Sequence, residues 1–423
     1  MNYTKTTLPN GIRVITVPMP SLESVTVAIW TGVGSRYEED KIAGLSHFLE
    51  HMVFKGSVKR PSARAISEAV DEIGGEFNAG TTKEWTNFYI KCRKDNLNTA
   101  FDVLSDMVLN PLLKEEDIQK EKGVILEEMA MYEDTPMVNI NDVFEETMFG
   151  KTPLGRDTIG IRKAIEEAKK DDFVLYRKQY YYPENLVITV SGGVTDKMAL
   201  DMAVKYFGGL SGSQNKQFKK WKSVQTKPQL KLKTKKVEQA HFILGFLGKP
   251  KGNPDRFTES VLAGILGGGM SSRLFSEIRE KRGLAYSVRT SADHFVDTGY
   301  IGTYAGVDLK KIDEAIKVTL SEHYKIAGKN HGITPKELTK AKEYIKGHLA
   351  LYLEDTKGVG GFFGDQEVLL GKVETPEEVF AGIDKVTLDD VVRVAKELFI
   401  PEKLNLAVIG PYNSEAEFEK LIK

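Results

Sequence analysis

The stretch Gly44-Leu45-Ser46-His47-Phe48-Leu49-Glu50-His51-Met52-Val53-Phe54 is the most informative part of this sequence. It contains His-x-x-Glu-His, the inverse of the His-Glu-x-x-His zinc motif. On a helix, His47 and His51 lie one turn apart on the same face, so both imidazoles can bind one metal ion. Glu50 lies beside them, where it can hold a water molecule. A structural role for the two histidines is the alternative, and because catalytic zinc usually takes three protein ligands, a third must be found.

An acidic segment expected to be a helix over residues 115–133 supplies the candidates Glu121, Glu127 and Glu128. At 100° per residue, Glu121 and Glu128 share one face and Glu127 points away from it. That face also carries the apolar side chains of Ile118, Val124, Ile125 and Tyr132. A carboxylate on a buried face needs a partner, and a metal ion is one. We therefore predict that Glu128 is the third ligand rather than an ordinary surface acid, and that Glu121 accepts a hydrogen bond from His47 or His51.

Composition sets the class of protein. A chain of 423 residues suits two domains of roughly 200 residues each. The formal net charge of −1 gives no overall basic field that would attract nucleic acid or anionic lipid. The single cysteine, Cys92, excludes an intrachain disulfide and fits a reducing compartment. There is no apolar run of about 18 residues and no apolar segment at the N-terminus. We therefore expect a cytoplasmic protein that binds neither nucleic acid nor membrane.

Sequence echoes indicate an internal duplication. Residues 183–190 (PENLVITV) resemble residues 401–408 (PEKLNLAV), and residues 132–135 (YEDT) resemble residues 353–356 (LEDT). Both echoes are offset by about 220 residues, as in a tandem repeat. Where the His-x-x-Glu-His helix should recur, the second half has residues 267–275 (GGGMSSRLF), without a ligand set.

The predicted fold is α+β, with two homologous domains, each a mainly antiparallel sheet with helices packed on one side. We expect a metal-bearing domain over residues 1–210 and a second domain without a metal over residues 228–423. Residues 211–227 are polar, basic and without periodicity, which is typical of a linker. A basic patch for an acidic partner is the alternative interpretation of that segment.

With these residues in hand, the sequence resembles the pitrilysin, insulin-degrading enzyme and mitochondrial processing peptidase family, the inverzincins. The resemblance covers essentially the whole chain and includes a glutamate 77 positions after the second histidine, at Glu128. Further matching motifs are Leu8-Pro9-Asn10-Gly11, residues 77–82 (FNAGTT), residues 153–156 (PLGR), residues 182–186 (YPENL), residues 272–275 (SRLF) and residues 279–287 (REKRGLAYS).

The resemblance implies a role for each matching site residue. It implies one Zn²⁺ per chain, with Glu50 as the base, Glu121 as the supporting acid, and three ligands, His47, His51 and Glu128. It implies that an edge strand binds the substrate as an added β-strand through Asn78, Ala79 and Gly80. In the second half, it implies that Arg279 and Tyr286 contact the substrate and the developing oxyanion.

The implied activity is that of a zinc metalloendopeptidase that cleaves unfolded peptides or leader segments. Relatives enclose the substrate in a clamshell of four such domains, so the resemblance implies a dimer. Both residue sets lie in one chain, which favours a homodimer whose partner completes the site. A non-catalytic scaffold subunit is the alternative, and the sequence leaves open the choice between leader processing and general oligopeptide degradation.

Overall fold

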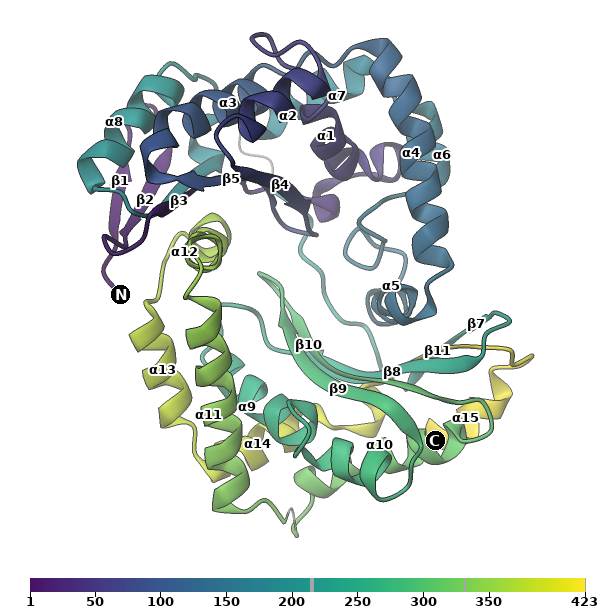
Figure 1. The fold of residues 1–423 in the computed structure, drawn as a ribbon. Helices are drawn as coiled ribbons and strands as arrows, with labels where there is room; N and C mark the ends of the chain where they lie inside the picture. The colour runs from purple at the N-terminus through teal and green to yellow at the C-terminus, as the bar shows by residue number, and fades with distance from the viewer. Residues whose placement is uncertain (214–216, 331, 423) are drawn as a thin grey trace. The chain divides into compact units, whose positions relative to one another are not determined.

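The computed structural model describes residues 1–213, 217–330 and 332–422. The chain folds into two compact units, each of which combines one β-sheet with several helices (Figure 1). Unit 1 comprises Met1–Met129, Asp157–Lys219 and Ala350–Pro376, and unit 2 comprises Ala130–Arg156, Lys220–Leu349 and Glu377–Lys423. This arrangement confirms the predicted α+β class.

Unit 1 contains a six-stranded sheet in the order β1-β2-β6-β3-β5-β4. Strands β2 and β6 are parallel, and the other neighbouring pairs are antiparallel. Strand β4 therefore forms one edge of the sheet and β1 the other. The strands are β1 (Thr4–Thr7), β2 (Arg13–Pro18), β3 (Ser24–Thr31), β4 (Glu76–Thr81), β5 (Thr86–Arg93) and β6 (Leu186–Gly192).

Unit 2 repeats this topology in a five-stranded sheet with the order β7-β11-β8-β10-β9. Strands β7 and β11 are parallel, as β2 and β6 are, and the remaining pairs are antiparallel. The shared order and direction of the strands confirm the duplication that the sequence predicts. The strands are β7 (Gln229–Thr234), β8 (Gln239–Gly248), β9 (Ala285–His294), β10 (Gly299–Asp308) and β11 (Leu404–Gly410).

The helices of unit 1 place the site residues. Helices α1 and α2 pack against β4, α3 packs against β3 and β5, and α8 packs against β2. Helix α4 runs over the whole span predicted from the sequence and crosses the border between the units. The helices are α1 (Leu45–Val53), α2 (Ala63–Asp71), α3 (Leu97–Leu109), α4 (Glu115–Glu133), α6 (Arg162–Glu167), α7 (Lys170–Tyr180), α8 (Asp196–Phe207) and α12 (Thr356–Leu370).

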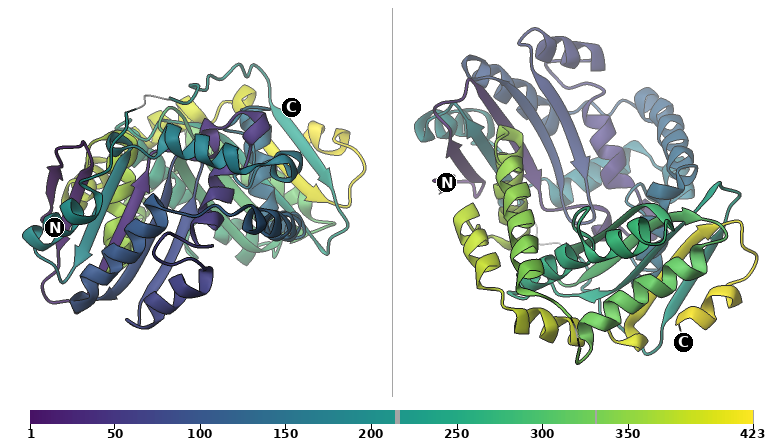
Figure 2. Two further views of the ribbon diagram at one scale, coloured as in Figure 1. Left: turned by 90° about the horizontal axis from the view of Figure 1, so that it is seen from above. Right: turned by 60° about the horizontal axis from the view of Figure 1, so that its bottom comes forward.

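In unit 2, helices α9, α10 and α14 cover one face of the sheet, and the right-hand view of Figure 2 shows green and yellow helices in front of its strands. A π-helical segment, Phe275–Glu280, leads towards β9. The helices are α5 (Pro136–Phe149), α9 (Arg256–Gly267), α10 (Ile312–Ala327), α11 (Pro335–Tyr352), α13 (Pro376–Lys385), α14 (Leu388–Leu398) and α15 (Ala416–Ile422).

The packing units differ from the sequential division predicted at 1–210 and 228–423. Helix α5, from the first half of the chain, packs on β7, β8 and β11 of unit 2. Helix α12, from the second half, packs on β2, β3 and β6 of unit 1. Figure 1 shows α12 and α3 on opposite sides of the first sheet. Helices therefore cover both faces of this sheet, whereas the sequence predicted helices on one side.

The second face of each sheet explains this exchange. In unit 2, Ile243 and Ile409 on the sheet are buried with Phe144 and Phe149 of α5 in one apolar cluster. A sheet face that carries such side chains is costly to leave in water, because each buried apolar side chain contributes roughly 1.5–3 kcal/mol.

In unit 1 the corresponding contact is close because α12 is rich in glycine. A Cβ atom on Gly364 would lie 2.3 Å from the indole of Trp30 on β3. The Trp30 indole also donates from Nε1 to Thr189 Oγ1 on β6 over 3.1 Å. At the start of α12, Thr356 Oγ1 lies 2.8 Å from Thr26 Oγ1, within hydrogen-bond distance. Small residues on the helix and polar groups on the sheet thus set the distance between the two layers.

The described part of residues 211–227 contains no helix or strand, and the border between the units at Lys219–Lys220 falls within it. Residues 214–216 of this predicted linker lie outside the described residues. Among the described residues, no helix is both long and apolar enough to cross a membrane. The cytoplasmic location stays a prediction.

The contact between α12 and the sheet generates a stability prediction. Replacing Gly364 with Ala should destabilise unit 1 by about 1–3 kcal/mol, because the added methyl group overlaps the Trp30 indole. Two of the three tryptophans, Trp30 and Trp85, lie in unit 1, so intrinsic fluorescence during urea unfolding reports this change.

Gly347→Ala is the matched control, since a Cβ atom at Gly347 in α11 meets nothing within 4 Å. It should keep or raise the free energy of unfolding, by up to about 1 kcal/mol, because Ala favours the helix more than Gly. Equal midpoints for Gly364→Ala and the wild type would contradict the packing argument.

Candidate metal centre

The start of α1 is fixed by a buried carboxylate. Glu38 accepts hydrogen bonds from the backbone N–H groups of Gly44 and Ser46, each over 2.6 Å, and from Ser46 Oγ over 2.5 Å. These donors belong to the first turn, where backbone N–H groups have no partner within the helix and a negative charge is favourable. Gly44 adopts a left-handed conformation with φ of 100°, and a Cβ there would lie 2.4 Å from the carbonyl oxygen of Ile159. These contacts fix the residue at which α1 begins, and therefore the face of the helix on which His47 and His51 lie.

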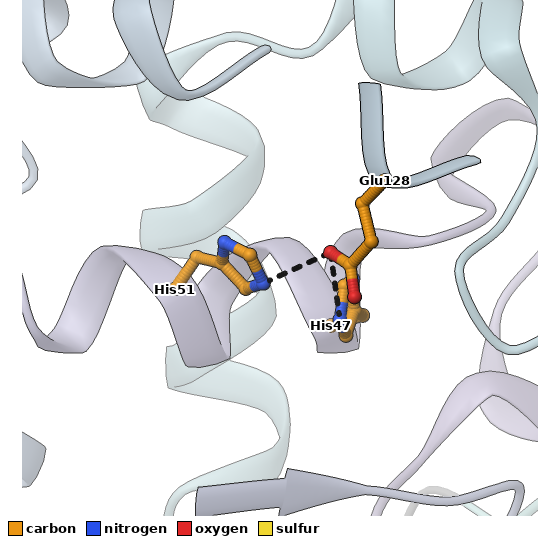
Figure 3. Close-up of side chains that lie close together, drawn as sticks. All are labelled: His47, His51 and Glu128. Atoms are coloured by element: carbon orange, nitrogen blue, oxygen red, sulfur yellow. Dashed lines mark ion pairs between the residues drawn. The ribbon is translucent and has the colours of Figure 1, made fainter. Parts of the chain in front are cut away.

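His47, His51 and Glu128 converge, as Figure 3 shows. Glu128 Oε2 lies 3.8 Å from His47 Nε2 and 3.5 Å from His51 Nε2. The histidines come from α1 and the glutamate from α4, so the cluster depends on how these two helices pack. Each side chain is mostly buried, with 14%, 21% and 21% of its surface exposed for His47, His51 and Glu128, respectively.

This donor set fits a zinc ion. Two ligand atoms at 2.0–2.1 Å from zinc in a tetrahedral arrangement lie roughly 3.4 Å apart. One candidate atom from each of the three residues lies within 4.8 Å of the others, and the two nitrogen–oxygen distances are close to the tetrahedral value. Two imidazoles and one carboxylate are also a ligand combination that catalytic zinc sites use.

A second carboxylate orients His51. Glu121 Oε1 lies 2.9 Å from His51 Nδ1, and Glu121 Oε2 pairs with Lys55 Nζ at 2.5 Å. Burial opposes ionisation of Glu121, but the hydrogen bonds from His51 and Lys55 hold its pKa below the ordinary value. An ionised Glu121 accepts the Nδ1–H of His51, which leaves the Nε2 lone pair free for a metal.

His47 is held in the neutral form that a metal ligand needs. Burial, and then the neighbouring His51 ring, lower the pKa of His47 to about 3. The Nδ1 atom of His47 is buried and has no hydrogen-bond partner among the described residues.

Glu50 lies between the two histidines in sequence and outside the cluster of converging atoms. Burial raises the pKa of Glu50 above its ordinary value, while a hydrogen bond from Thr81 acts in the opposite direction. Thr81 Oγ1 donates to Glu50 Oε2 over 2.5 Å. A raised pKa brings a carboxylate closer to the range in which it can accept and return a proton near neutral pH.

The structure also places the helical face predicted for α4. Glu121 is buried, Glu128 is half-buried and Glu127 is exposed, in agreement with the predicted phase. The prediction for Val124 was wrong, because 49% of this side chain is exposed. The buried face of α4 is therefore narrower than predicted, and its buried apolar residues are Ile118 and Ile125.

The predicted substrate-binding residues of unit 1 lie on an edge strand. Asn78, Ala79 and Gly80 belong to β4, at the edge of the first sheet. Asn78 Oδ1 accepts a hydrogen bond from the Ala79 backbone N–H over 2.8 Å. This N–H group of the edge strand is therefore bonded to a neighbouring side chain.

Arg279 and Tyr286 lie together in unit 2. Arg279 Nη1 donates to the Tyr286 carbonyl oxygen over 2.9 Å, and its guanidinium lies 4.5 Å from the centre of the Tyr286 ring. The guanidinium also lies 4.9 Å from the ring centre of Phe275, which is on the same π-helical segment. The Tyr286 side chain is 76% exposed, so its hydroxyl is accessible to a ligand.

Sequence reasoning missed three residues around this site. Lys55 continues the four-residue spacing of His47 and His51, and this spacing is a signal that could have identified it. Thr81 stands two residues after Ala79 and therefore shares its strand face. Glu38 has no comparable signal, because its contacts with Gly44 and Ser46 depend on the path of an irregular loop.

The geometry predicts that Glu128 and Glu127 differ in their effect on metal binding. Glu128→Gln should weaken zinc binding by more than about 100-fold, since loss of a partner outside the ligand set already costs 10–100-fold. The matched control, Glu127→Gln, should leave zinc affinity unchanged because that side chain is exposed. Competition with a chromophoric chelator measures both affinities, and equal losses in the two variants would contradict the assignment.

Comparisons with known proteins identify the family of this chain. Residues 13–161 match the family model described as insulinase, peptidase family M16, and residues 168–345 match the model of the peptidase M16 inactive domain. The uncharacterized zinc protease YmxG of Bacillus subtilis is 38% identical, covering 96% of this chain and 97% of that protein. An uncharacterized zinc protease of Mycobacterium leprae is 36% identical, covering 99% of this chain and 94% of that protein.

Solved structures share the fold at lower sequence identity. A protease from Helicobacter pylori superposes with a TM-score of 0.90 at 24% identity, covering 97% of this chain and 99% of that chain. A chain of Complex III2 from Candida albicans superposes with a TM-score of 0.85 at 19% identity, with complete coverage of both chains. The matches over both halves confirm the resemblance that the motifs indicate, and the chain belongs to peptidase family M16.

Proposed function

We propose that this protein is a zinc-dependent endopeptidase that cleaves peptides bound in an extended conformation. The observation that carries the proposal is the convergence of His47 Nε2, His51 Nε2 and a Glu128 carboxylate oxygen, with Glu50 beside them. The names of the relatives, zinc proteases, support the same metal and reaction class.

Each residue of unit 1 has a role in this proposal. His47, His51 and Glu128 would hold the zinc ion, and Glu121 would keep His51 in the tautomer that binds it. A zinc ion there supplies a Lewis acid for the peptide carbonyl and lowers the pKa of a water ligand to about 7. Glu50 accepts the proton of the attacking water and delivers it to the amine that leaves.

Strand β4 would bind the substrate. Its outer edge offers main-chain groups at Asn78, Ala79 and Gly80, to which an extended peptide can add as a further strand. The Asn78 side chain would rotate away from the Ala79 N–H when the peptide binds. Recognition through the main chain reads few side chains, which suits a protease of broad specificity.

Arg279 and Tyr286, which belong to unit 2, would complete the metal site of a partner chain. Arg279 would contact the substrate, and the exposed Tyr286 hydroxyl would donate to the oxyanion that develops on the scissile carbonyl. We propose further that the two chains of a homodimer form a clamshell, in which this pair serves the metal site of the partner.

A non-catalytic subunit of a larger complex is the second candidate function. Chains of this fold occur in Complex III2, and another solved structure of this fold is described as a peptidase M16 inactive domain. The intact set of His47, Glu50, His51 and Glu128 favours the enzyme. Cleavage-site mapping on a mixed peptide library, with and without a chelator, distinguishes the two functions and separates leader processing from general oligopeptide degradation.

Replacing the base tests the mechanism directly. Glu50→Gln should abolish peptide hydrolysis because the amide cannot accept the proton, while zinc content stays near one ion per chain. Peptide cleavage by mass spectrometry and metal content by plasma emission measure these two quantities. His51→Ala is the contrasting variant and should lose zinc as well as activity. Retained hydrolysis in Glu50→Gln would rule out the assigned base.

Mixing two inactive variants tests the homodimer. One chain carries Glu50→Gln, and the other carries Arg279→Ala with Tyr286→Phe. If the site is completed across the dimer, each mixed dimer contains one intact site, and activity at equal amounts should recover to roughly a quarter of the wild-type value.

The control for this experiment is proof of exchange, obtained with two different affinity tags on the two chains. Mixed dimers that form and remain inactive would overturn completion of the site by the partner. That result would leave the protease assignment in place, because Glu50→Gln alone tests it.

A further inference from the structure

The strand proposed to bind substrate also contacts the proposed base. Thr81, the last residue of β4, donates from Oγ1 to Oε2 of Glu50 on α1 over 2.5 Å. Among the described residues, this hydroxyl is the side-chain group that donates a hydrogen bond to Glu50. The bond therefore joins the edge of the sheet to the helix that carries both histidines.

Alternation along β4 explains why Thr81 faces α1. Phe77, Ala79 and Thr81 point to the same face of the strand. The Phe77 ring packs against Phe54, immediately after α1, with ring centres 5.5 Å apart. The strand thus meets the α1 segment at two places, one apolar at Phe77 and one polar at Thr81.

The backbone beneath Thr81 is held on several sides. Thr81 pairs with Thr86 in the β4–β5 ladder, and the following turn closes with a hydrogen bond from the Thr82 N–H to the Trp85 carbonyl over 2.9 Å. The loop before α1 donates to this turn through the Ser35 N–H, which lies 3.1 Å from the Thr82 carbonyl oxygen. The two charged residues of this turn, Lys83 and Glu84, are buried.

A buried ion pair anchors the same turn. Glu84 is 3% exposed and pairs with Arg36, which is also 3% exposed, over 2.5 Å. The guanidinium of Arg36 lies 3.7 Å from the ring centre of Phe218. The position of the Thr81 hydroxyl is therefore set by the fold and not by a mobile loop.

We propose that Thr81 is a positioning residue that holds the Glu50 carboxylate in its reactive orientation. The inference rests on the proposed function. With Oε2 bound by Thr81, the other oxygen of Glu50 stays available for proton transfer. Because Asn78, Ala79 and Gly80 lie on the same strand, the element that aligns the peptide also aligns the base. Holding the base and the scissile peptide in the correct relative geometry lowers the barrier to reaction.

A purely structural role for Thr81 is the competing explanation. In that case the hydroxyl would only join β4 to α1, and its loss would lower stability or substrate affinity. The two roles differ in what they change, because an orientation effect on the base lowers kcat and leaves KM and folding unchanged.

Thr81→Val and Thr81→Ser separate these roles. Val keeps the shape and removes the hydroxyl, and should lower kcat about ten- to hundredfold, as expected for loss of a hydrogen bond to a charged group. Ser keeps the hydroxyl and should restore most of the rate. KM, zinc affinity and the unfolding midpoint should stay at wild-type values in both variants. Thr7→Val is the matched control, since Thr7 is an exposed residue of β1, the opposite edge of the sheet.

A readout without activity completes the test. In crystals of the metal-free protein, Glu50 should adopt one orientation in the wild type and more than one in Thr81→Val. A wild-type kcat and a single Glu50 orientation in Thr81→Val would overturn the role of Thr81 alone. A rise in KM, or a loss of stability large enough to account for the lost rate, would also overturn it. A wild-type protein that cleaves no peptide would instead contradict the proposed function, and the crystallographic comparison would still decide the role of Thr81.

Discussion

The hydrogen bond between His51 and Glu121 is the interaction on which the candidate site depends. It joins α1 to α4 over 2.9 Å, and it lies beside the three converging residues. This contact ties the histidines of α1 to the helix that carries Glu128, because the three residues come from two separate helices. Lys55 strengthens the junction by keeping Glu121 ionised. One buried carboxylate therefore orients a ligand and holds two helices together.

Burial acts on the neighbouring groups in opposite directions, and both directions suit the proposed chemistry. It lowers the pKa of His47, which keeps this ring neutral and able to bind a metal. It raises the pKa of Glu50, which makes this carboxylate a better proton acceptor. Burial thus favours the neutral, metal-binding form of His47 and the proton-accepting role of Glu50, although both residues lie on α1.

The fold supports this site by covering both faces of each sheet. Helices α5 and α12 each pack on the sheet formed by the other half of the chain, so neither half is a complete structural unit by itself. A duplicated sequence therefore does not produce two independent sequential domains. The exchange buries apolar side chains such as Ile243, and it requires small residues such as Gly364 where a helix comes close.

The sequence by itself determined the span of α4, the helical face that carries Glu121 and Glu128, and the duplication of an α+β unit. The first two follow from hydrophobic periodicity and spacing among neighbouring residues, and the third follows from segments that recur about 220 residues apart. Only the tertiary structure decided the exchange of α5 and α12, the cap of α1 by Glu38 and the contact of Thr81 with Glu50. Each of these joins segments that are distant in the chain or connected by irregular loops. These contacts depend on how the helices pack on the sheets, and the periodicity within one segment carries no information about packing between segments.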